Sequence, residues 1–405
     1  MTRFPTCAPL ALLVTIGLVA CGDDDGPSMT VDAGRDAGPD TSPPDEDMGP
    51  DRDMGPDRDM GPDAGPPPVV CEPAETDFDL DATADDGWPA CSADDGAFDL
   101  FGMSVSTFAR VNAFDEIAAL LWRRDAPPSP EDFLSAREIY SLDQGLGSRV
   151  GRRFDAHLPE CSIAEPAMTN ECQRPGASET CADRCIGPAL LEPAVLAAFQ
   201  AGAMGLEPML NAARIEAALL WFFYVSAYKE PNTCADVIAD CDSGVAYYRG
   251  DSGLSADGLS LARTTDPAMT DGFARYVLEA DEDADAALME SFLAVRCWRE
   301  MDNPAGVAMN DALHQQALGQ LDRALDHALA RVLIRRTETF AAATGIFREA
   351  HWELLRNLGP AIDRAATARD PALAATLRTE LAKTDPSTVD PDALTTTLES
   401  LFPCP

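Results

Sequence analysis

The run AALLWFFYVSAY, from Ala217 to Tyr228, is the feature that most constrains what this chain can fold into. It has the length of a helix and is apolar on nearly every side. A helix that is hydrophobic all round is stable only when other elements cover it. The apolar residues between Glu216 and Lys229 are too few to cross a bilayer, which needs about 20. We therefore expect a helix over Met209 to Tyr228 at the centre of a bundle.

Apolar residues at steps of three and four predict further helices along most of the chain beyond residue 100. Sustained strand alternation appears nowhere, so the predicted fold class is all-α, an irregular helical bundle. The expected helices are 108–123; Ser129-Pro130 to about Leu142, with Ser129 as N-cap; 209–228; one or two within 266–302; a long helix that starts after Asn303-Pro304 and carries the stripe Leu318, Leu321, Leu325, Ala328 and Val332; one from Gly345 to Gly359-Pro360; and short helices at the end.

The N-terminus has the order of a secretory signal. Arg3 supplies a basic start, residues 8–20 form a short apolar region, and the small residue Ala20 precedes Cys21. This apolar region is too short to span a bilayer. The stretch Leu18-Val19-Ala20-Cys21 resembles the lipobox of bacterial lipoproteins. The resemblance implies a signal peptide over residues 1–20, acylation of Cys21 with palmitate-type chains, and a lipid-anchored location on the bacterial cell envelope, outside the cytoplasm. An ordinary cleaved signal with Cys21 free or paired is the alternative.

Residues 21–70 predict a disordered tether. Between Gly22 and Val70 there are 14 acidic and 3 basic side chains, no aromatic residue, and three copies of Asp-Met-Gly-Pro with a period of six. Such a segment buries too little apolar surface to offset its backbone entropy. Its fully extended length is about 170 Å. We expect the lipid to hold the chain at a membrane, and the tether to hold the folded domain, residues 71–405, away from it.

The folded domain carries 55 acidic and 26 basic side chains. This excess of negative charge argues against nucleic acid as a partner, because nucleic acid binding depends on neutralising phosphates. It also argues against docking of the domain on anionic lipid. A cationic ligand or a protein partner with a basic surface would be attracted. About 335 residues are ample for a hydrophobic core. The sequence does not indicate an oligomeric state.

Ten cysteines remain in the folded domain once Cys7 leaves with the signal and Cys21 is acylated. An even number in an exported chain predicts disulfides. A continuous helix would separate the Cα atoms of Cys234 and Cys241 by about 10.5 Å, so a bond between them requires a break, which we expect at Asp240 to Gly244. The expected pairs are Cys71–Cys91, Cys234–Cys241, two bonds among Cys161, Cys172, Cys181 and Cys185, and Cys297–Cys404.

Three patterns invite comparison with metal sites. The cluster at 161–185 lacks the Cys-x-x-Cys pairs usual for zinc, and an exported chain meets oxidising conditions, which favour disulfides. Residues 77–81, Asp-x-Asp-x-Asp, open like a calcium loop, but Ala82 stands where the turn glycine belongs and Trp88 replaces the closing glutamate. The aspartates of the tether lack the same two features. We therefore expect disulfides and an acidic lead-in at these positions.

Asp311 and His314 are the remaining metal candidates. His314 lies on the apolar stripe of the long helix, with Asp311 one turn before it. Carboxylate-bridged metal sites in bundles need two such elements and further glutamates. The competing interpretation is a core-edge histidine bonded within its own helix. Exported helical proteins of the imelysin type carry Gly-x-His-x-x-Glu, but His157-Leu158-Pro159-Glu160 has Asp155 in the glycine position, so that family's function is not carried over. No cofactor is predicted.

Local catalytic motifs are missing from the sequence. There is no nucleophile elbow, no phosphate loop and no His-Glu-x-x-His helix. Gly250-Asp251-Ser252-Gly253 predicts a loop, and Ser252 has no histidine near it in sequence. An enzyme would need a site assembled from residues far apart in the chain. We therefore favour a non-enzymatic function.

Three functional hypotheses follow. The first is a membrane-tethered interaction module on the envelope. The second is a binder of a metal or a small ligand inside the bundle, and the third is an enzyme. Carboxylates or histidines within about 4 Å of His314 would favour a metal, whereas a large open cavity beside Trp221 would favour a small ligand. The ligand hypothesis uses Asp311 and His314, or the aromatic residues Trp221, Phe222, Phe223, Tyr224 and Tyr228, for which core packing is the competing interpretation.

Overall fold

The computed structural model describes residues 74, 76–80, 88, 96–102, 105–142, 145–162, 170–300 and 310–404. These residues form α-helices and one two-stranded sheet, which confirms the predicted all-α class. They belong to one compact unit. The predicted signal peptide, Cys21 and the tether lie outside the described residues. In the described part, no helix combines the length and the apolar character needed to cross a membrane.

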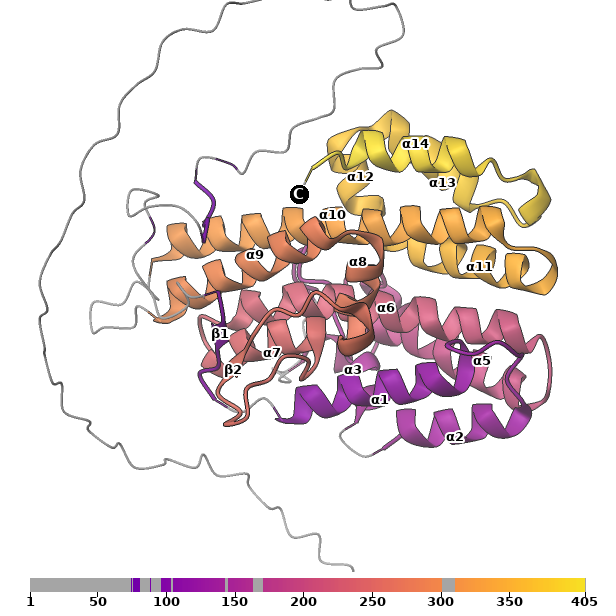
Figure 1. Cartoon of the computed structure of the whole chain (residues 1–405), viewed down its shortest axis with the longest axis horizontal. Helices are drawn as coiled ribbons and strands as arrows, with labels where there is room; N and C mark the ends of the chain where they lie inside the picture. Colours follow the sequence, from indigo (N-terminus) through magenta and orange to yellow (C-terminus); the bar gives the residue numbers. More distant parts are fainter. Residues whose placement is uncertain are drawn as a thin grey trace, which may run out of the picture. The chain divides into compact units, whose positions relative to one another are not determined.

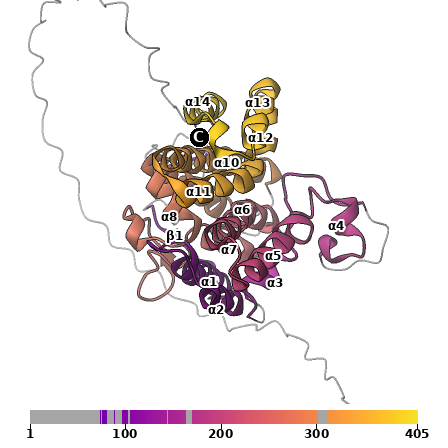
Figure 2. The same ribbon diagram turned by 90° about the vertical axis from the view of Figure 1, so that its right-hand side faces the viewer.

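The helices of this unit stack in layers (Figures 1 and 2). One outer layer is formed by α1 (Val105–Leu121) and α2 (Pro130–Tyr140). Next to it lie α5 (Glu192–Ala203), α6 (Pro208–Thr233) and α7 (Ile238–Arg249). The following layer contains α8 (Gly272–Ala280), α9 (Glu282–Glu300), α10 (Asp311–Ala342) and α11 (Gly345–Leu358). The opposite outer layer contains α12 (Asp363–Arg369), α13 (Pro371–Leu381) and α14 (Pro391–Leu401).

Short elements connect these layers. Strands β1 (Phe98–Asp99) and β2 (Ser260–Leu261) pair antiparallel, with Phe98 opposite Leu261. The short helical elements are α3 (Leu146–Val150), η2 (Glu171–Gln173), α4 (Ala177–Thr180), η3 (Gly187–Leu191), η4 (Pro267–Met269), η6 (Gly359–Ile362) and η7 (Pro386–Thr388).

The helix α6 lies at the centre of the bundle, as its sequence predicts (Figure 2). It contacts α5, α7 and α11, and every side chain from Ala217 to Ala227 is buried. The helix is longer than predicted and continues through Pro231 to Thr233. Pro231 has no backbone N–H to donate to the carbonyl of residue 227, and the helix ends two residues later, at Thr233. Helix α6 is apolar on all sides because neighbouring helices cover it on all sides.

Sequence periodicity does not predict α5. Its residues, EPAVLAAFQAGA, are mostly small, and few large apolar side chains mark its buried face. The helix nevertheless packs closely against α2. A Cβ atom at Gly202 would lie 2.3 Å from the ring of Phe133, so glycine permits this approach.

Local signals place several helix ends correctly. Ser129 and Asp132 form a reciprocal capping box at the start of α2, where Pro130 occupies the first helical position. The segment 266–302 contains the pair α8 and α9. In α10 the predicted stripe is buried throughout. The described part of this helix begins after Asn310, whose side chain accepts a hydrogen bond from the Leu313 amide at 3.2 Å. The predicted start at Asn303-Pro304 lies outside the described residues.

Three disulfides have both ends in the described part: Cys161–Cys181, Cys172–Cys185 and Cys234–Cys241, with Cα separations of 5.9, 5.2 and 5.0 Å. The two bonds predicted within 161–185 and the bond Cys234–Cys241 are thus confirmed, and the zinc alternative is excluded for these cysteines. Cys297 and Cys404 are also disulfide-bonded, but their predicted pairing with each other stays a prediction. Cys71 and Cys91 lie outside the described residues.

The predicted position of the helix break at Cys234–Cys241 is wrong. Asp240 to Gly244 belong to α7, which starts at Ile238. The break comes earlier, between the end of α6 at Thr233 and that start. The cause is the chain reversal between the two helices, which brings Cys234, directly after the end of α6, close to Cys241 in the first turn of α7.

Candidate functional site

A pocket of about 870 Å³ opens beside Trp221 of the central helix α6. Small-molecule sites in proteins typically measure about 300 to 1,000 Å³ and have mostly apolar linings with a few polar groups. We call this cavity the Trp221 pocket. Its lining comes from two regions far apart in sequence: residues 155–190 and residues 356–382.

Apolar side chains dominate the lining of the Trp221 pocket. Ile186 and Leu190 come from the end of the disulfide-bonded segment and from η3. Pro360 of η6 and Leu377 of α13 come from the C-terminal helices. Leu190 is 46% exposed, so its side chain is accessible from the pocket. The lining therefore suits the apolar body of a small molecule.

Covalent and ionic contacts fix the first of these two regions. Cys161–Cys181 and Cys172–Cys185 cross-link it. The buried Arg184 donates from Nη1 to the backbone carbonyls of Asp155 at 2.5 Å and Leu158 at 2.6 Å, and its guanidinium pairs with Glu171 at 2.7 Å. An arginine fork that bonds carbonyls and a carboxylate together holds loop backbone in one place. The pocket is consequently formed before a ligand arrives.

His157 lies behind the pocket, between two carboxylates. Its Nδ1 is 2.6 Å from Asp155 Oδ1 and its Nε2 is 2.9 Å from Asp322 Oδ1. Its ring stacks on Tyr228 with centroids 3.8 Å apart and an interplanar angle of 8°. Burial alone would lower the pKa of His157, but the hydrogen bonds and charges of Asp155 and Asp322 outweigh it and raise that pKa. The imidazolium therefore joins residues 155–157 to α10.

Two carboxylates of α10, Asp322 and Asp326, also contact an arginine. Arg364 of α12 lies 3.0 Å from Asp322 Oδ1 and 3.4 Å from Asp326 Oδ1. Tyr224 of α6 donates its hydroxyl to Asp326 at 2.7 Å. Burial and the charge of Asp322 raise the pKa of Asp326 to about 6. This chain of contacts connects α6, α10 and α12 at the base of the Trp221 pocket.

The charges that line the Trp221 pocket balance. Arg378 and Asp363 pair with each other at 2.6 Å, at an exposed position. A ligand that enters this pocket therefore meets no excess of either sign, although the chain as a whole has a net charge of −39. The six charged residues of the lining are three acids and three arginines: Asp155, Asp183, Asp363, Arg356, Arg364 and Arg378.

The predicted aromatic cavity is only partly formed. Trp221 lines the pocket. Phe222 and Phe223 pack against each other and against Tyr247 in the core. Tyr224 and Tyr228 hold the charged network behind the pocket. Successive residues of a helix point in different directions, so a run of aromatics cannot line one cavity.

The structure does not bring Asp311 and His314 together as a metal site. His314 stacks on Trp298 with ring centroids 3.7 Å apart, and its Nε2 lies 3.0 Å from the carbonyl oxygen of Pro231. Asp311 is exposed. Across the described ranges, no group of three His, Cys, Asp or Glu side chains is placed to hold a metal ion. The hydrogen bond of His314 is to α6 and not, as the competing interpretation expects, within its own helix.

Ser252, which the sequence analysis considers for catalysis, and the remaining histidines His327 and His351 are not arranged as a catalytic site. Ser252 donates its hydroxyl to Asp271 at 2.6 Å and accepts the amide of the same residue at 2.7 Å. His327 has its Nδ1 3.1 Å from the carbonyl oxygen of Phe402. Burial and the charge of Arg336 lower the pKa of His351 to about 4. None of these contacts forms a pair of nucleophile and base.

Sequence reasoning missed the site around His157. His157 lies in a loop. Its partner Asp322 and the further contact Arg364 lie on helices more than a hundred residues later. No local motif joins these positions, because only the packing of α10 and α12 against residues 155–157 brings them together.

Comparison of this chain with known protein families, curated proteins and solved structures finds no match. The geometry of the pockets is therefore the ground on which a function is proposed.

Proposed function

We propose that this chain is an exported bacterial lipoprotein whose helical domain binds a small, mostly apolar molecule with no net charge in the Trp221 pocket. The cavity of about 870 Å³ beside Trp221 is the observation that carries the proposal. An interaction module has no need of such a cavity, whereas a ligand-binding protein has. We therefore favour the binding of a small ligand over the protein-interaction hypothesis.

The proposed location rests on Cys21 and on the chemistry of the folded domain. Acylation of Cys21 after removal of residues 1–20 would supply several chains, and two or more anchor a protein stably. The three disulfides of the described part support an oxidising compartment. The tether 21–70 would let the domain meet its ligand away from the membrane surface.

The location is tested by expressing the full chain in a bacterium and examining its mature N-terminus. We expect a mass consistent with acylated Cys21 as the first residue, and partition into the detergent phase. Cys21→Ser is expected to move the protein to the aqueous phase. A mature N-terminus at any other residue would contradict the lipoprotein proposal.

Ligand binding is tested by native mass spectrometry of the full chain purified in detergent. We expect a bound small molecule in the wild type, and its loss in Leu190→Trp, because the larger side chain fills the pocket that Leu190 lines. Leu134→Trp is the matched control: Leu134 is an equally exposed leucine, at 50%, on α2. Identical spectra of bound species in both variants would contradict the proposal.

A further inference from the structure

A second pocket, of about 350 Å³, lies on the other side of residues 153–155 from the Trp221 pocket. Phe154 lines this second pocket, whereas Asp155 lines the Trp221 pocket. Its remaining residues come from the start of α1, the end of α3 and the segment that follows it, Asn170, the end of α6, and α7. We call it the basic pocket.

Positive side chains are concentrated in the basic pocket. Five cationic side chains line it against two carboxylates, an excess of three positive charges. The whole chain, in contrast, has a net charge of −39. Like charges held close together in a partly buried site repel one another and cost stability unless something neutralises them. The cations are Arg110, Arg149, Arg152, Arg153 and Lys229, and the carboxylates are Glu230 and Asp240.

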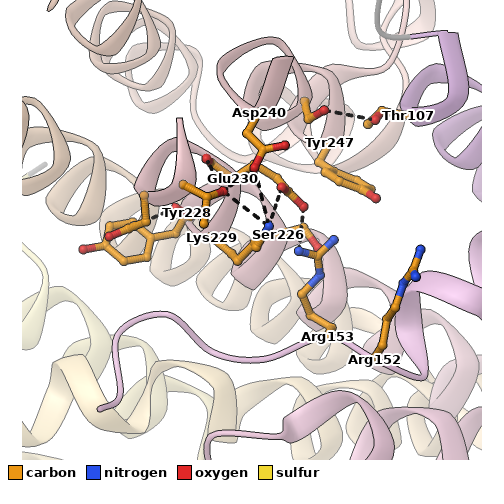
Figure 3. A network of polar contacts seen from close by, with 12 residues as sticks. Thr107, Arg152, Arg153, Ser226, Tyr228, Lys229, Glu230, Asp240 and Tyr247 are labelled. Carbon is orange, nitrogen blue, oxygen red and sulfur yellow. Dashed lines mark hydrogen bonds and ion pairs between the residues drawn. The ribbon is translucent and has the colours of Figure 1, made fainter. Parts of the chain in front are cut away.

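The two carboxylates of the basic pocket already have partners. Glu230 Oε1 pairs with Arg153 Nη1 at 2.7 Å, and Glu230 Oε2 pairs with Lys229 Nζ at 2.7 Å (Figure 3). Asp240 accepts a hydrogen bond from the hydroxyl of Thr233 and lies 3.8 Å from Lys229. Burial would raise the pKa of Glu230, but Arg153 and Lys229 lower it. These contacts neutralise Arg153 and Lys229 and leave the excess charge elsewhere.

Arg149 and Arg152 carry two of these three excess charges. Within the described residues neither guanidinium forms an ion pair or a side-chain hydrogen bond, and the buried Nε of Arg149 has no partner. Figure 3 shows Arg153 joined to Glu230 while Arg152, from the same segment, makes no marked contact. Burial lowers the pKa of Arg152, and the positive charges of Arg110 and Arg153 act in the same direction.

The backbone fixes these arginines at the pocket. The amide of Gly187 donates to the carbonyl of Arg153 at 2.9 Å. A Cβ atom at Gly187 would lie 2.1 Å from the carbonyl oxygen of Val150, so the segment that carries the arginines rests directly on η3. The side-chain amide of Asn170 also donates, from Nδ2, to the backbone carbonyl of Arg152 at 3.1 Å. Backbone contacts therefore place Arg149 and Arg152 beside each other, and among the described residues no carboxylate pairs with either of them.

We propose that the basic pocket binds a small doubly charged oxyanion of the phosphate or sulfate type, held by Arg149 and Arg152. A guanidinium presents paired N–H donors that match the oxygens of such an anion. The hydroxyls of Thr107 and Ser243, 3.4 Å apart in the same lining, supply neutral hydrogen-bonding groups. A dianion would neutralise most of the excess charge, and the volume admits a free ion or a small phosphate monoester.

The test is isothermal titration of the full chain, purified in detergent, with inorganic phosphate, with sulfate, and with chloride at equal ionic strength. We expect one phosphate or sulfate per chain and no saturable binding of chloride. Arg149→Gln and Arg152→Gln are each expected to weaken phosphate binding about tenfold, since a hydrogen bond to a charged group contributes at least that factor. Arg335→Gln, a change of an exposed arginine on α10, is the control and is expected to leave binding unchanged.

A second measurement separates loss of the site from loss of the fold. In buffer without phosphate or sulfate, Arg152→Gln is expected to unfold at the same temperature as the wild type or higher, because it removes repulsion among the arginines. Added phosphate should then raise the unfolding temperature of the wild type and not that of the variant. Absence of phosphate binding by the wild type, or equal binding by Arg149→Gln/Arg152→Gln, would overturn the proposal.

Discussion

Residues 149–158 border two pockets of opposite character. On one side, Asp155 and His157 belong to a chain of contacts that continues to Asp322 and Arg364, so the charges behind the Trp221 pocket neutralise one another. On the other side, Arg149 and Arg152 have no carboxylate partner in the described part of the chain. A balanced network fixes a structure around a mostly apolar cavity. An unbalanced cluster among the described residues fits the oxyanion that we propose as its ligand.

The same contrast exists within the basic pocket. Arg153 is buried and paired with Glu230 through a 2.7 Å contact, and its guanidinium also lies 5.2 Å and 5.1 Å from the ring centroids of Phe222 and Tyr247. Arg152 is half-buried and has none of these contacts. Two adjacent arginines therefore have different roles: Arg153 joins the segment after α3 to α6, while Arg152 remains available to a ligand.

The largest effect is expected from breaking the buried pair. Glu230→Gln leaves the positive charge of Arg153 buried without a carboxylate, and we expect it to lower the free energy of unfolding by about 3–5 kcal/mol. Chemical denaturation of the full chain measures this. Glu338→Gln breaks an exposed pair with Arg335 and is expected to cost about 0.5 kcal/mol or less. Equal effects of the two changes would show that the Arg153–Glu230 pair has no special structural role.

The next effect concerns the disulfides that fix residues 155–190. Cys172→Ser/Cys185→Ser is expected to lower the free energy of unfolding by about 2–4 kcal/mol and to weaken binding of an apolar dye in the Trp221 pocket. Cys234→Ser/Cys241→Ser removes a disulfide whose cysteines are 7 residues apart in sequence, compared with 13 for Cys172–Cys185. This disulfide lies outside the Trp221 pocket. Its removal is expected to leave dye binding unchanged. The idea of a preformed pocket fails if both double variants bind the dye as the wild type does.

A smaller, pH-dependent effect is expected from His157. The pKa of His157 is raised in the folded state. Its ion pairs therefore contribute fully to the stability of the fold below the unfolded-state pKa of about 6.5, and this contribution is lost as the pH rises through the folded-state pKa. Burial alone would raise the pKa values of Asp155 and Asp322, but the hydrogen bonds and charge of His157 outweigh it and lower both. The contribution of these two carboxylates to stability is therefore lost in acid, below about pH 4. The cost of His157→Gln should therefore be greatest near pH 5–6 and decrease at higher pH.

Denaturation at several pH values checks this, with His351→Gln as the control. The pKa of His351 is lowered to about 4, so its ring is neutral in the folded state and protonation favours the unfolded state below about pH 6.5. The stability difference between wild type and His351→Gln should therefore have the opposite slope. A pH-independent cost of His157→Gln would mean that His157 is not charged between its two carboxylates.

Structural features that depend on residues close in sequence could be predicted from the sequence, whereas features that depend on the packing of distant segments could not. The central position of Ala217 to Ala227, the stripe of α10 and the N-cap at Ser129 all follow from local patterns, and the structure confirms them. Sequence also predicts two disulfides among Cys161, Cys172, Cys181 and Cys185, but four cysteines allow three sets of pairs. Only the folded loop selects one set.

The candidate sites were least accessible to sequence reasoning. Trp221 was a candidate, but the cavity beside it depends on η6 and α13, which are more than a hundred residues away. Arg149, Arg152 and Arg153 stand close together in sequence, but only the packing of α1, α6 and α7 around them forms the basic pocket. His314 gave a metal-like pattern, and its real partners, Trp298 and Pro231, lie on other helices.

The most direct test of this account measures the two pockets together in one titration experiment. Nile red, a neutral apolar dye, and inorganic phosphate are titrated into the full chain and into Leu190→Trp and Arg149→Gln/Arg152→Gln. We predict that the wild type binds both at once, that Leu190→Trp loses the dye and keeps phosphate, and that the arginine variant loses phosphate and keeps the dye. Competition between dye and phosphate, or loss of both in either variant, would contradict the assignment of two separate sites.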